Sequence, residues 1–258
     1  MSDTAVSLVN FQIKVHSGAL TWRWPLIMLV ARSLLFAGWQ IAIAAALAWR
    51  GVENPWQASI AWWPWAGILT SLIILVLLAW LFYNEGSSLV GLYRFDRTHL
   101  KSDLLVMLGF FVLAGPVGYL PNLIFGNLLF GRAEAASALM FLRLPLWAAA
   151  TAMLLFPLTV ALTELPTYFG YSMPRIEALS GKAWLAVLLP SFFLAVQHMA
   201  LPLIFDPRFL AYRLLMFLPF ALLVGVLLHW RPRLMPYMII VHFLIDIPTI
   251  LFVLLASL

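Results

Sequence analysis

The sequence predicts an all-α fold, a polytopic integral membrane protein with about seven transmembrane helices in one bundle. Of the 258 residues, 64% are hydrophobic and only 10% are charged, and the mean hydropathy is +1.01. A soluble protein of this size needs more polar residues to cover its core, so lipid must serve as the solvent. A helix needs about 20 apolar residues to cross a bilayer, and seven such stretches follow one another along the chain.

The apolar stretches define the expected domain organisation. We expect a cytoplasmic N-terminal tail over residues 1–23 and a single transmembrane helical domain over residues 24–258. The first stretch is too long for the core of a signal peptide and no convincing cleavage site follows it, so we expect a retained anchor helix. The expected spans are 25–49, 59–83, 103–126, 136–162, 183–204, 209–229 and 234–257.

Proline and tryptophan positions agree with these spans. Prolines inside the apolar runs predict kinked helices, because neighbouring helices or water must satisfy the carbonyl groups that they free. Tryptophans gather near the expected span ends, where their amphipathic rings favour the headgroup layer. The segment between the second and third spans, residues 84–103, mixes apolar and basic residues, so we expect it at the cytoplasmic interface.

Lysine and arginine are distributed unevenly between the two sides of the expected bundle. With a cytoplasmic N-terminus, nine of them lie on the cytoplasmic side and three on the opposite side. Cytoplasmic loops carry the excess of positive charge, so we expect the N-terminus inside and the C-terminus outside, which requires an odd number of spans. The three on the outer side are Arg50, Arg132 and Arg208.

Composition also excludes several classes of function. Cysteine is absent, which excludes a disulfide framework, a thiolate zinc site and a cysteine nucleophile. No basic cluster is dense enough for nucleic acid, so the lipid bilayer is the first expected partner. Function must be sought among the few ionisable residues that lie in or beside the apolar runs.

Those ionisable residues are costly in hydrocarbon, and each is a candidate for a site. Three of them are arginines within a few turns of a span end, so we expect their long side chains to snorkel toward the headgroups. The open alternative is that one of them pairs with an acidic residue or a substrate carboxylate. The full set is Arg32, Arg143, Glu164, His198, Arg213, His242 and Asp246.

His242 and Asp246 stand four positions apart in an otherwise apolar run. On an α-helix this spacing places both side chains on one face, which we expect to point into the bundle. The pair is either a buried structural contact between imidazole and carboxylate or part of a site.

Glu164 and His198 need the rest of the fold to bring them together. Pro166 prevents an ordinary helix from continuing, so Glu164 should lie at a helix end or break. A lone histidine on an apolar helix is more often a packing residue than a catalyst. The two side chains meet if the helix that carries Glu164 ends inside the membrane and if the chain before Pro190 runs along the interface, so that the helix carrying His198 enters the membrane at Pro190. In this arrangement we expect the first three spans to be scaffold.

Two short motifs resemble the CPBP family of intramembrane peptidases, which includes CAAX-processing proteases and bacteriocin-immunity (Abi) proteins. The family patterns FxxxH and HxxxN or HxxxD correspond to Leu194-x-x-x-His198 and His242-x-x-x-Asp246. The resemblance covers residues 162–248. We expect these residues to form the catalytic-like core of the transmembrane domain.

The first family motif, EExxxR, is degenerate in this chain. Placing Gly170 on the glycine that often follows the motif puts Glu164 at the first glutamate. Leu165 then stands at the second glutamate and Phe169 at the arginine. The base of the family mechanism is therefore kept, while a supporting ion pair is lost.

The resemblance implies a CAAX-protease-like helical bundle and a glutamate-dependent peptidase without a cofactor. In that mechanism Glu164 and His198 activate a water that attacks the peptide carbonyl, and His242 and Asp246 support the oxyanion. The implied substrate is a hydrophobic peptide or a membrane protein. The lack of a targeting segment and the immunity-type relatives favour a bacterial cytoplasmic membrane.

Two alternatives use the same residues. One is a zinc-dependent membrane hydrolase, with His198, His242 and Asp246 as metal ligands and Glu164 as base. The other is a degenerate family member that binds a hydrophobic helix or peptide without cleaving it, as an immunity protein would.

Overall fold

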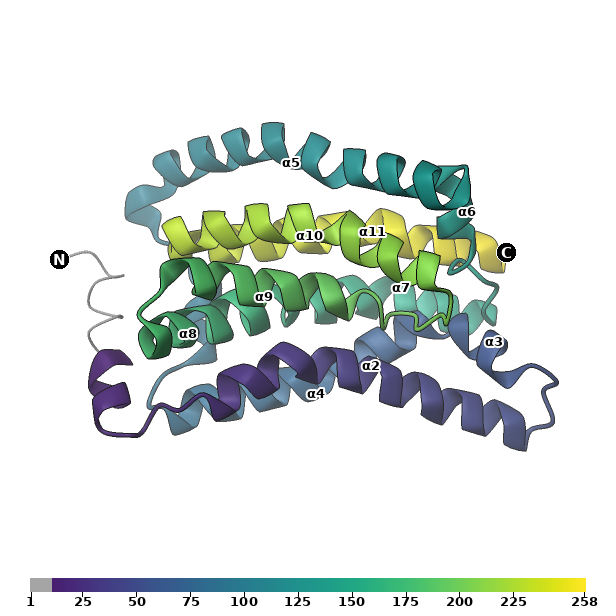
Figure 1. Ribbon diagram of the computed structural model, residues 1–258, viewed down its shortest axis with the longest axis horizontal. Coiled ribbons are helices and arrows are strands. Elements are labelled where there is room, and N and C mark those ends of the chain that lie inside the picture. The colour runs from purple at the N-terminus through teal and green to yellow at the C-terminus, as the bar shows by residue number, and fades with distance from the viewer. Residues whose placement is uncertain (1–10) are drawn as a thin grey trace.

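The computed structural model describes residues 11–258, which form a bundle of helices with nearly parallel long axes (Figure 1). Among these residues there is no β-sheet, so the all-α prediction is confirmed. The longer helices are α2 (Arg23–Trp49), α4 (Trp63–Asn84), α5 (Leu100–Phe130), α7 (Leu146–Ala161), α10 (Pro207–Trp230) and α11 (Met235–Ser257). The shorter α-helices are α3 (Pro55–Ile60), α6 (Ala133–Ala138), α8 (Met173–Ser180) and α9 (Ala183–Gln197).

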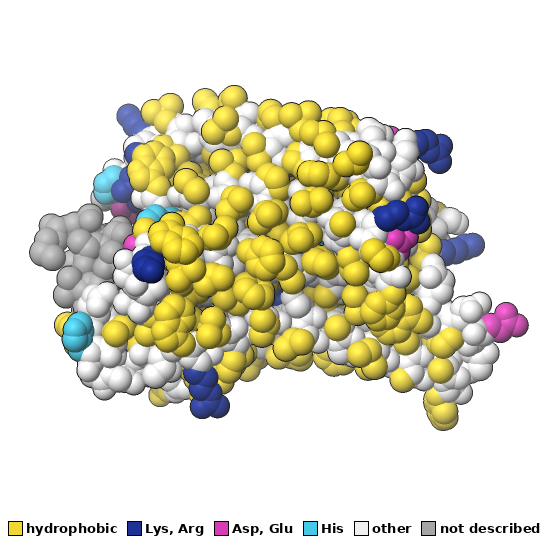
Figure 2. Space-filling view, viewed as in Figure 1, with side chains coloured by type: hydrophobic (Ala, Val, Ile, Leu, Met, Phe, Trp, Pro, Cys, Tyr) yellow, Lys and Arg dark blue, Asp and Glu magenta, His cyan; other side chains and the backbone are white. Residues whose placement is uncertain are grey.

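Within residues 11–258, six helical segments are long and apolar enough to cross a membrane. Their outward faces carry many exposed hydrophobic side chains, and in Figure 2 lysine and arginine gather mainly near the two ends of the long axis. An apolar belt between two charged ends is the surface that a lipid bilayer requires. The chain is therefore an integral membrane protein by its length, composition and surface.

Two of the seven expected spans differ from the structure. The fifth, 183–204, is the 15-residue helix α9, and residues 198–206 that follow it contain no helix. Pro202 offers no N–H to continue a helix, and Arg213 of α10 bonds the carbonyl groups of His198 and Leu201. The fourth, 136–162, begins with the end of α6, continues as a non-helical connection over 139–145, and only then forms α7.

The remaining apolar helix of the described residues is α9, which is shorter than the six segments. In Figure 1, α9 runs alongside α10, and the start of α2 lies at the opposite end of the bundle from the C-terminus. His198 follows directly on the last residue of α9.

The expected tail and interfacial segment lie together at one end of the bundle. Residues 1–10 of the tail are outside the described part of the chain, and residues 11–16 are helical. Lys14 Nζ donates to the Glu85 carbonyl at 2.6 Å. The segment 84–103 contains the short 3₁₀ helices η1 (Leu89–Tyr93) and η2 (Arg97–His99).

Close packing of α9 and α10 fixes part of the interior of the bundle. A Cβ atom on Gly225 of α10 would lie 2.5 Å from Ser191 Oγ and 3.0 Å from Phe169 Cε1, so only glycine permits this approach. α11 packs along α7, whereas α5 packs on α10 and α6 and is the least buried of the six long segments. A space remains between α5 and the α7–α11 pair, and it contains the candidate site.

Candidate functional site

A cavity of about 630 Å³ lies inside the bundle and is lined by residues of α5, α7, α9, α10 and α11. Most of its wall is apolar, with side chains such as Met216, Phe220 and Val241. All four residues that the sequence singled out as catalytic candidates line it: Glu164, His198, His242 and Asp246. The structure therefore brings these residues, which come from three separate regions of the chain, to one cavity.

Glu164 lies at a break between two helical segments, as Pro166 predicted. α7 ends at Ala161, a turn follows, and the next segment is the π-helix η3 (Pro166–Ser172). The Leu162 carbonyl, at the end of α7, accepts a hydrogen bond from the Tyr93 hydroxyl at 2.9 Å. Short π-helical turns are frequent at functional sites because they redirect side chains. Glu164 itself is only 6% exposed.

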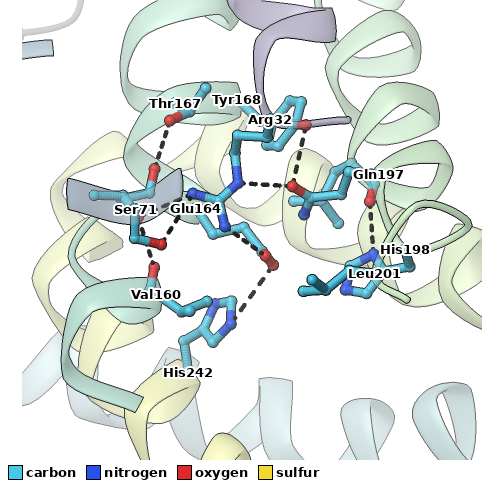
Figure 3. A network of polar contacts seen from close by, with 12 residues as sticks. Arg32, Ser71, Val160, Glu164, Thr167, Tyr168, Gln197, His198, Leu201 and His242 are labelled. Carbon is cyan, nitrogen blue, oxygen red and sulfur yellow. Dashed lines mark hydrogen bonds and ion pairs between the residues drawn. The ribbon is translucent and has the colours of Figure 1, made fainter. Parts of the chain in front are cut away.

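Arg32 of α2 lies beside Glu164, which is the alternative that the sequence left open for one of the three arginines. Its side chain is fully buried, so the expectation that it snorkels toward the headgroups is wrong. Arg32 Nη2 lies 3.5 Å from Glu164 Oε2, and Arg32 Nη1 donates to Thr163 Oγ1 at 3.0 Å (Figure 3). Ser71 of α4 also accepts from Nη1, at 3.5 Å. The helices expected to be scaffold thus supply part of the site.

Gln197 connects the same network to α9. Its Oε1 accepts from Arg32 Nε at 2.7 Å and from the Tyr168 hydroxyl at 3.3 Å (Figure 3). Gln197 is completely buried, and its Nε2 has no hydrogen-bond partner among residues 11–258. The sequence offered one signal for this role, because Gln197 is the polar neighbour of His198 in an apolar helix.

His242 and Asp246 share one face of α11, as their spacing predicted. His242 Nε2 lies 3.5 Å from Glu164 Oε1 and 3.5 Å from Asp246 Oδ2. It therefore stands between the two carboxylates. Asp246 Oδ2 is buried without a hydrogen-bond partner in the described part of the chain. The imidazole and the Asp246 carboxylate are thus neighbours without a hydrogen bond between them.

His198 lines the cavity but makes its side-chain contacts elsewhere. Its Nδ1 bonds the Leu194 carbonyl oxygen at 2.7 Å, and its ring stacks on Phe217 with 3.6 Å between centroids. With Nδ1 donating to a carbonyl, Nε2 is the nitrogen left to accept a proton. The helix that carries it runs unbroken through Pro190, so the expected change of direction at that proline is not needed.

Arg213 of α10 is a buried arginine of the cavity wall. It is 6% exposed, so its predicted snorkelling is also wrong. Its Nε donates to the His198 carbonyl at 3.0 Å, and its Nη2 donates to the Leu201 carbonyl at 3.0 Å. Arg143, by contrast, is exposed on the connection before α7, in keeping with the prediction for it.

The two degenerate positions of the first motif are apolar and buried. Leu165 is 4% exposed and lines the cavity, and Phe169 is 3% exposed and packs beside Gly225. No charge is available at either position. The guanidinium beside Glu164 comes from Arg32 instead.

The zinc alternative requires His198, His242 and Asp246 to surround one ion. Within residues 11–258, no group of three or more His, Asp or Glu side chains is close enough to hold a metal ion. His198 is turned toward Leu194 and Phe217, which explains why the third ligand is missing. We therefore do not propose a zinc site.

Comparisons of this chain with protein-family models, with curated proteins and with solved structures find no match. The resemblance to the CPBP family is therefore carried by the sequence motifs alone.

Proposed function

We propose that this protein is an intramembrane peptidase that uses Glu164 to hydrolyse a peptide bond in a membrane-associated peptide or protein. The observation that carries the proposal is the position of Glu164, a buried carboxylate on a cavity wall, with His242 beside it and His198 on the same wall. A carboxylate and two imidazoles around one apolar cavity are the groups that general acid–base hydrolysis needs.

The proposed reaction is the addition of water to a peptide carbonyl. Glu164 takes a proton from the water, and the water oxygen bonds to the carbonyl carbon. This addition produces a tetrahedral oxyanion. The C–N bond then breaks, and the proton passes to the leaving amine. The products are one carboxylic acid and one amine, so one water is consumed for each bond cleaved.

The neighbouring side chains divide the remaining tasks. In this proposal His198 accepts a hydrogen bond from the water through Nε2, since Nδ1 is engaged with the Leu194 carbonyl. His242 and Asp246 stabilise the oxyanion, with His242 as the donor. Arg32 supplies the positive charge beside Glu164 that the family obtains from its own first motif. The loss of an arginine at Phe169 therefore does not leave the glutamate without a cationic partner.

The shape of the cavity supports a hydrophobic substrate. It is bounded on one side by α5, which contains Pro116 and Pro121 and packs mainly on α10 and α6. On the other side it is bounded by α11, through Ile245 and Thr249. An apolar segment that is already in the bilayer can reach such a cavity without crossing water.

One observation favours a second candidate, a binding protein without catalysis. Leu165 places an apolar side chain on the cavity wall where the family has a glutamate. A protein of this kind would hold a hydrophobic peptide or helix in the cavity and release it unchanged.

Reconstitution into liposomes tests the two candidates. The protein is incubated with a library of apolar peptides, and cleavage is followed by mass spectrometry for wild type, Glu164→Gln, His198→Ala and Glu53→Gln. Glu53 is an exposed glutamate in the loop between α2 and α3, so its variant is the matched control. We expect cleavage by wild type and Glu53→Gln and none by Glu164→Gln.

Two results would contradict the peptidase proposal. One is that wild type and Glu164→Gln show the same absence of cleavage for every peptide, while peptides still bind to both proteins. This result would favour the binding protein. The other is cleavage that survives Glu164→Gln, which would show that another group is the base.

A further inference from the structure

Arg213 is a buried cation without a carboxylate partner. No Asp or Glu among residues 11–258 forms an ion pair with it. Two aromatic rings lie beside it, with its guanidinium 4.8 Å from the Phe217 ring centroid and 5.9 Å from that of Phe209. A charge in such a place is costly unless it is paired, so Arg213 needs an explanation beyond packing.

The hydrogen bonds of Arg213 leave part of its guanidinium free. Nε and Nη2 each donate once to a main-chain carbonyl, at His198 and Leu201. Among residues 11–258, the only hydrogen-bond partner of Nη1 is the sulfur of Met140 at 3.6 Å, which is a weak acceptor. Since a guanidinium has five N–H donors, the Nη1 group and one Nη2 proton remain available to an incoming acceptor.

Arg213 belongs to the wall of the cavity. Arg213 lines the same cavity as Glu164, beside the polar side chains of Asn122, Ser137 and Tyr212. Tyr212 donates its hydroxyl proton to Asn122 Oδ1, so the amide group of Asn122 is left as a donor. The cavity therefore has two polar regions: one around Glu164 and one around Arg213.

We propose that Arg213 forms a subsite for a carboxylate carried on an apolar chain. Two parallel N–H groups of one guanidinium fit the two oxygens of a carboxylate, and the single charges match. A phosphate would bring a larger charge to one arginine that has already used two of its donors. The apolar remainder of the cavity accommodates the chain that bears the carboxylate.

The carboxylate has two possible sources, the free C-terminus of an apolar peptide and a fatty acid. The subsite itself does not depend on hydrolysis. The identification of the peptide carboxylate as part of a substrate does depend on the proposed peptidase function, and it would favour substrates cleaved near a free C-terminus.

Equilibrium binding tests the subsite independently of cleavage. The probes are a short fluorescent apolar peptide with a free carboxyl group, the same peptide as a C-terminal amide, and a fluorescent fatty acid. Binding is measured in nanodiscs for wild type, Arg213→Gln and Arg143→Gln, the last being the same change at an exposed arginine outside the cavity. We expect wild type and Arg143→Gln to bind the acid about tenfold tighter than the amide, and Arg213→Gln to bind both equally.

The relative affinities of the two acids identify the source of the carboxylate. Tighter binding of the peptide acid assigns the subsite to a peptide C-terminus, and tighter binding of the fatty acid assigns it to a lipid. Equal binding of acid and amide by wild type overturns the proposal. So does an acid preference that survives Arg213→Gln, because Arg213 would then only hold the end of α9.

The folding role of Arg213 is controlled by a second variant. Where Arg213→Gln does not fold, Arg213→Lys replaces it, since lysine keeps the charge but lacks the planar pair of donors. The acid preference should fall in this variant, and an unchanged preference would overturn the proposal. Cleavage assays with Glu164→Gln are scored separately, so a protein that prefers acids but cleaves nothing refutes the peptidase and leaves the subsite in place.

Discussion

Arg32 Nη2 lies 3.5 Å from Glu164 Oε2, although 132 positions separate the two residues in the chain. The contact joins the first described transmembrane helix, α2, to the break after α7. Both side chains are buried, and Gln197 of α9 bonds the same guanidinium. One buried arginine therefore holds together three segments of the bundle at the candidate site.

Arg32→Gln should destabilise the protein strongly. Removing one partner of a buried ion pair leaves the other charge uncompensated, which costs about 3–5 kcal/mol. The free energy of unfolding in mild detergent measures this loss. Arg143→Gln, at an exposed arginine, should change it by less than about 0.5 kcal/mol.

A double variant separates the ion pair from the packing of Arg32. In Arg32→Gln with Glu164→Gln neither of the two positions carries a charge, so part of the lost stability should return. Additive losses in the two single variants would show that the two residues do not interact, and the role given to Arg32 would be wrong.

Gln197→Leu should cost more stability than Tyr168→Phe. Leucine leaves two buried donors, Arg32 Nε and the Tyr168 hydroxyl, without their acceptor, at about 1–3 kcal/mol for each unsatisfied group. Tyr168→Phe removes one donor and leaves Gln197 bonded to Arg32, so it should cost only about 0.5–1.5 kcal/mol. Thermal unfolding of both variants gives the order, and the reverse order would contradict the network.

The sequence predicted most of the bundle and four residues of the cavity wall, because hydropathy and helical spacing are local properties. His242 and Asp246 share a face through their spacing, and Pro166 fixes the break at Glu164. The role of Arg32 was not predictable in this way. Its distance from a span end is compatible with snorkelling, and only the packing of α2 against α9 and η3 turns it inward.

The early end of α9 shows a second limit of the sequence. Its apolar run continues past Gln197, so hydropathy alone extends the span to 204. The helix stops because Arg213, from another helix, bonds the carbonyl groups of His198 and Leu201. The hydropathy of the run after Gln197 does not show that a guanidinium from another helix binds its carbonyl groups, so the early end of α9 could not be predicted from the sequence.

Asp246→Asn should keep activity in the cleavage assay, whereas Asp246→Leu should lose it. Asparagine has nearly the same shape and can donate a hydrogen bond to an oxyanion, while leucine offers no polar atom. If Asp246 supports the oxyanion, the leucine variant should lower kcat by about 10²–10³-fold. Equal rates for the two variants would remove Asp246 from the proposed mechanism, and purified protein yield provides the folding control.

The orientation of the bundle can be tested with single cysteines, because the chain has none of its own. Glu53 lies in the exposed loop after α2, and Lys182 lies in the exposed turn before α9, at the opposite end of the bundle. With the N-terminus inside, a membrane-impermeant maleimide added to intact cells should label Glu53→Cys and spare Lys182→Cys. Labelling of Lys182→Cys should appear only after permeabilisation. The reverse pattern would invert the orientation inferred from the nine-to-three distribution of basic residues. Labelling of both variants in intact cells would show that α4, α5 and α7, which lie between the two positions in the chain, do not place them on opposite sides.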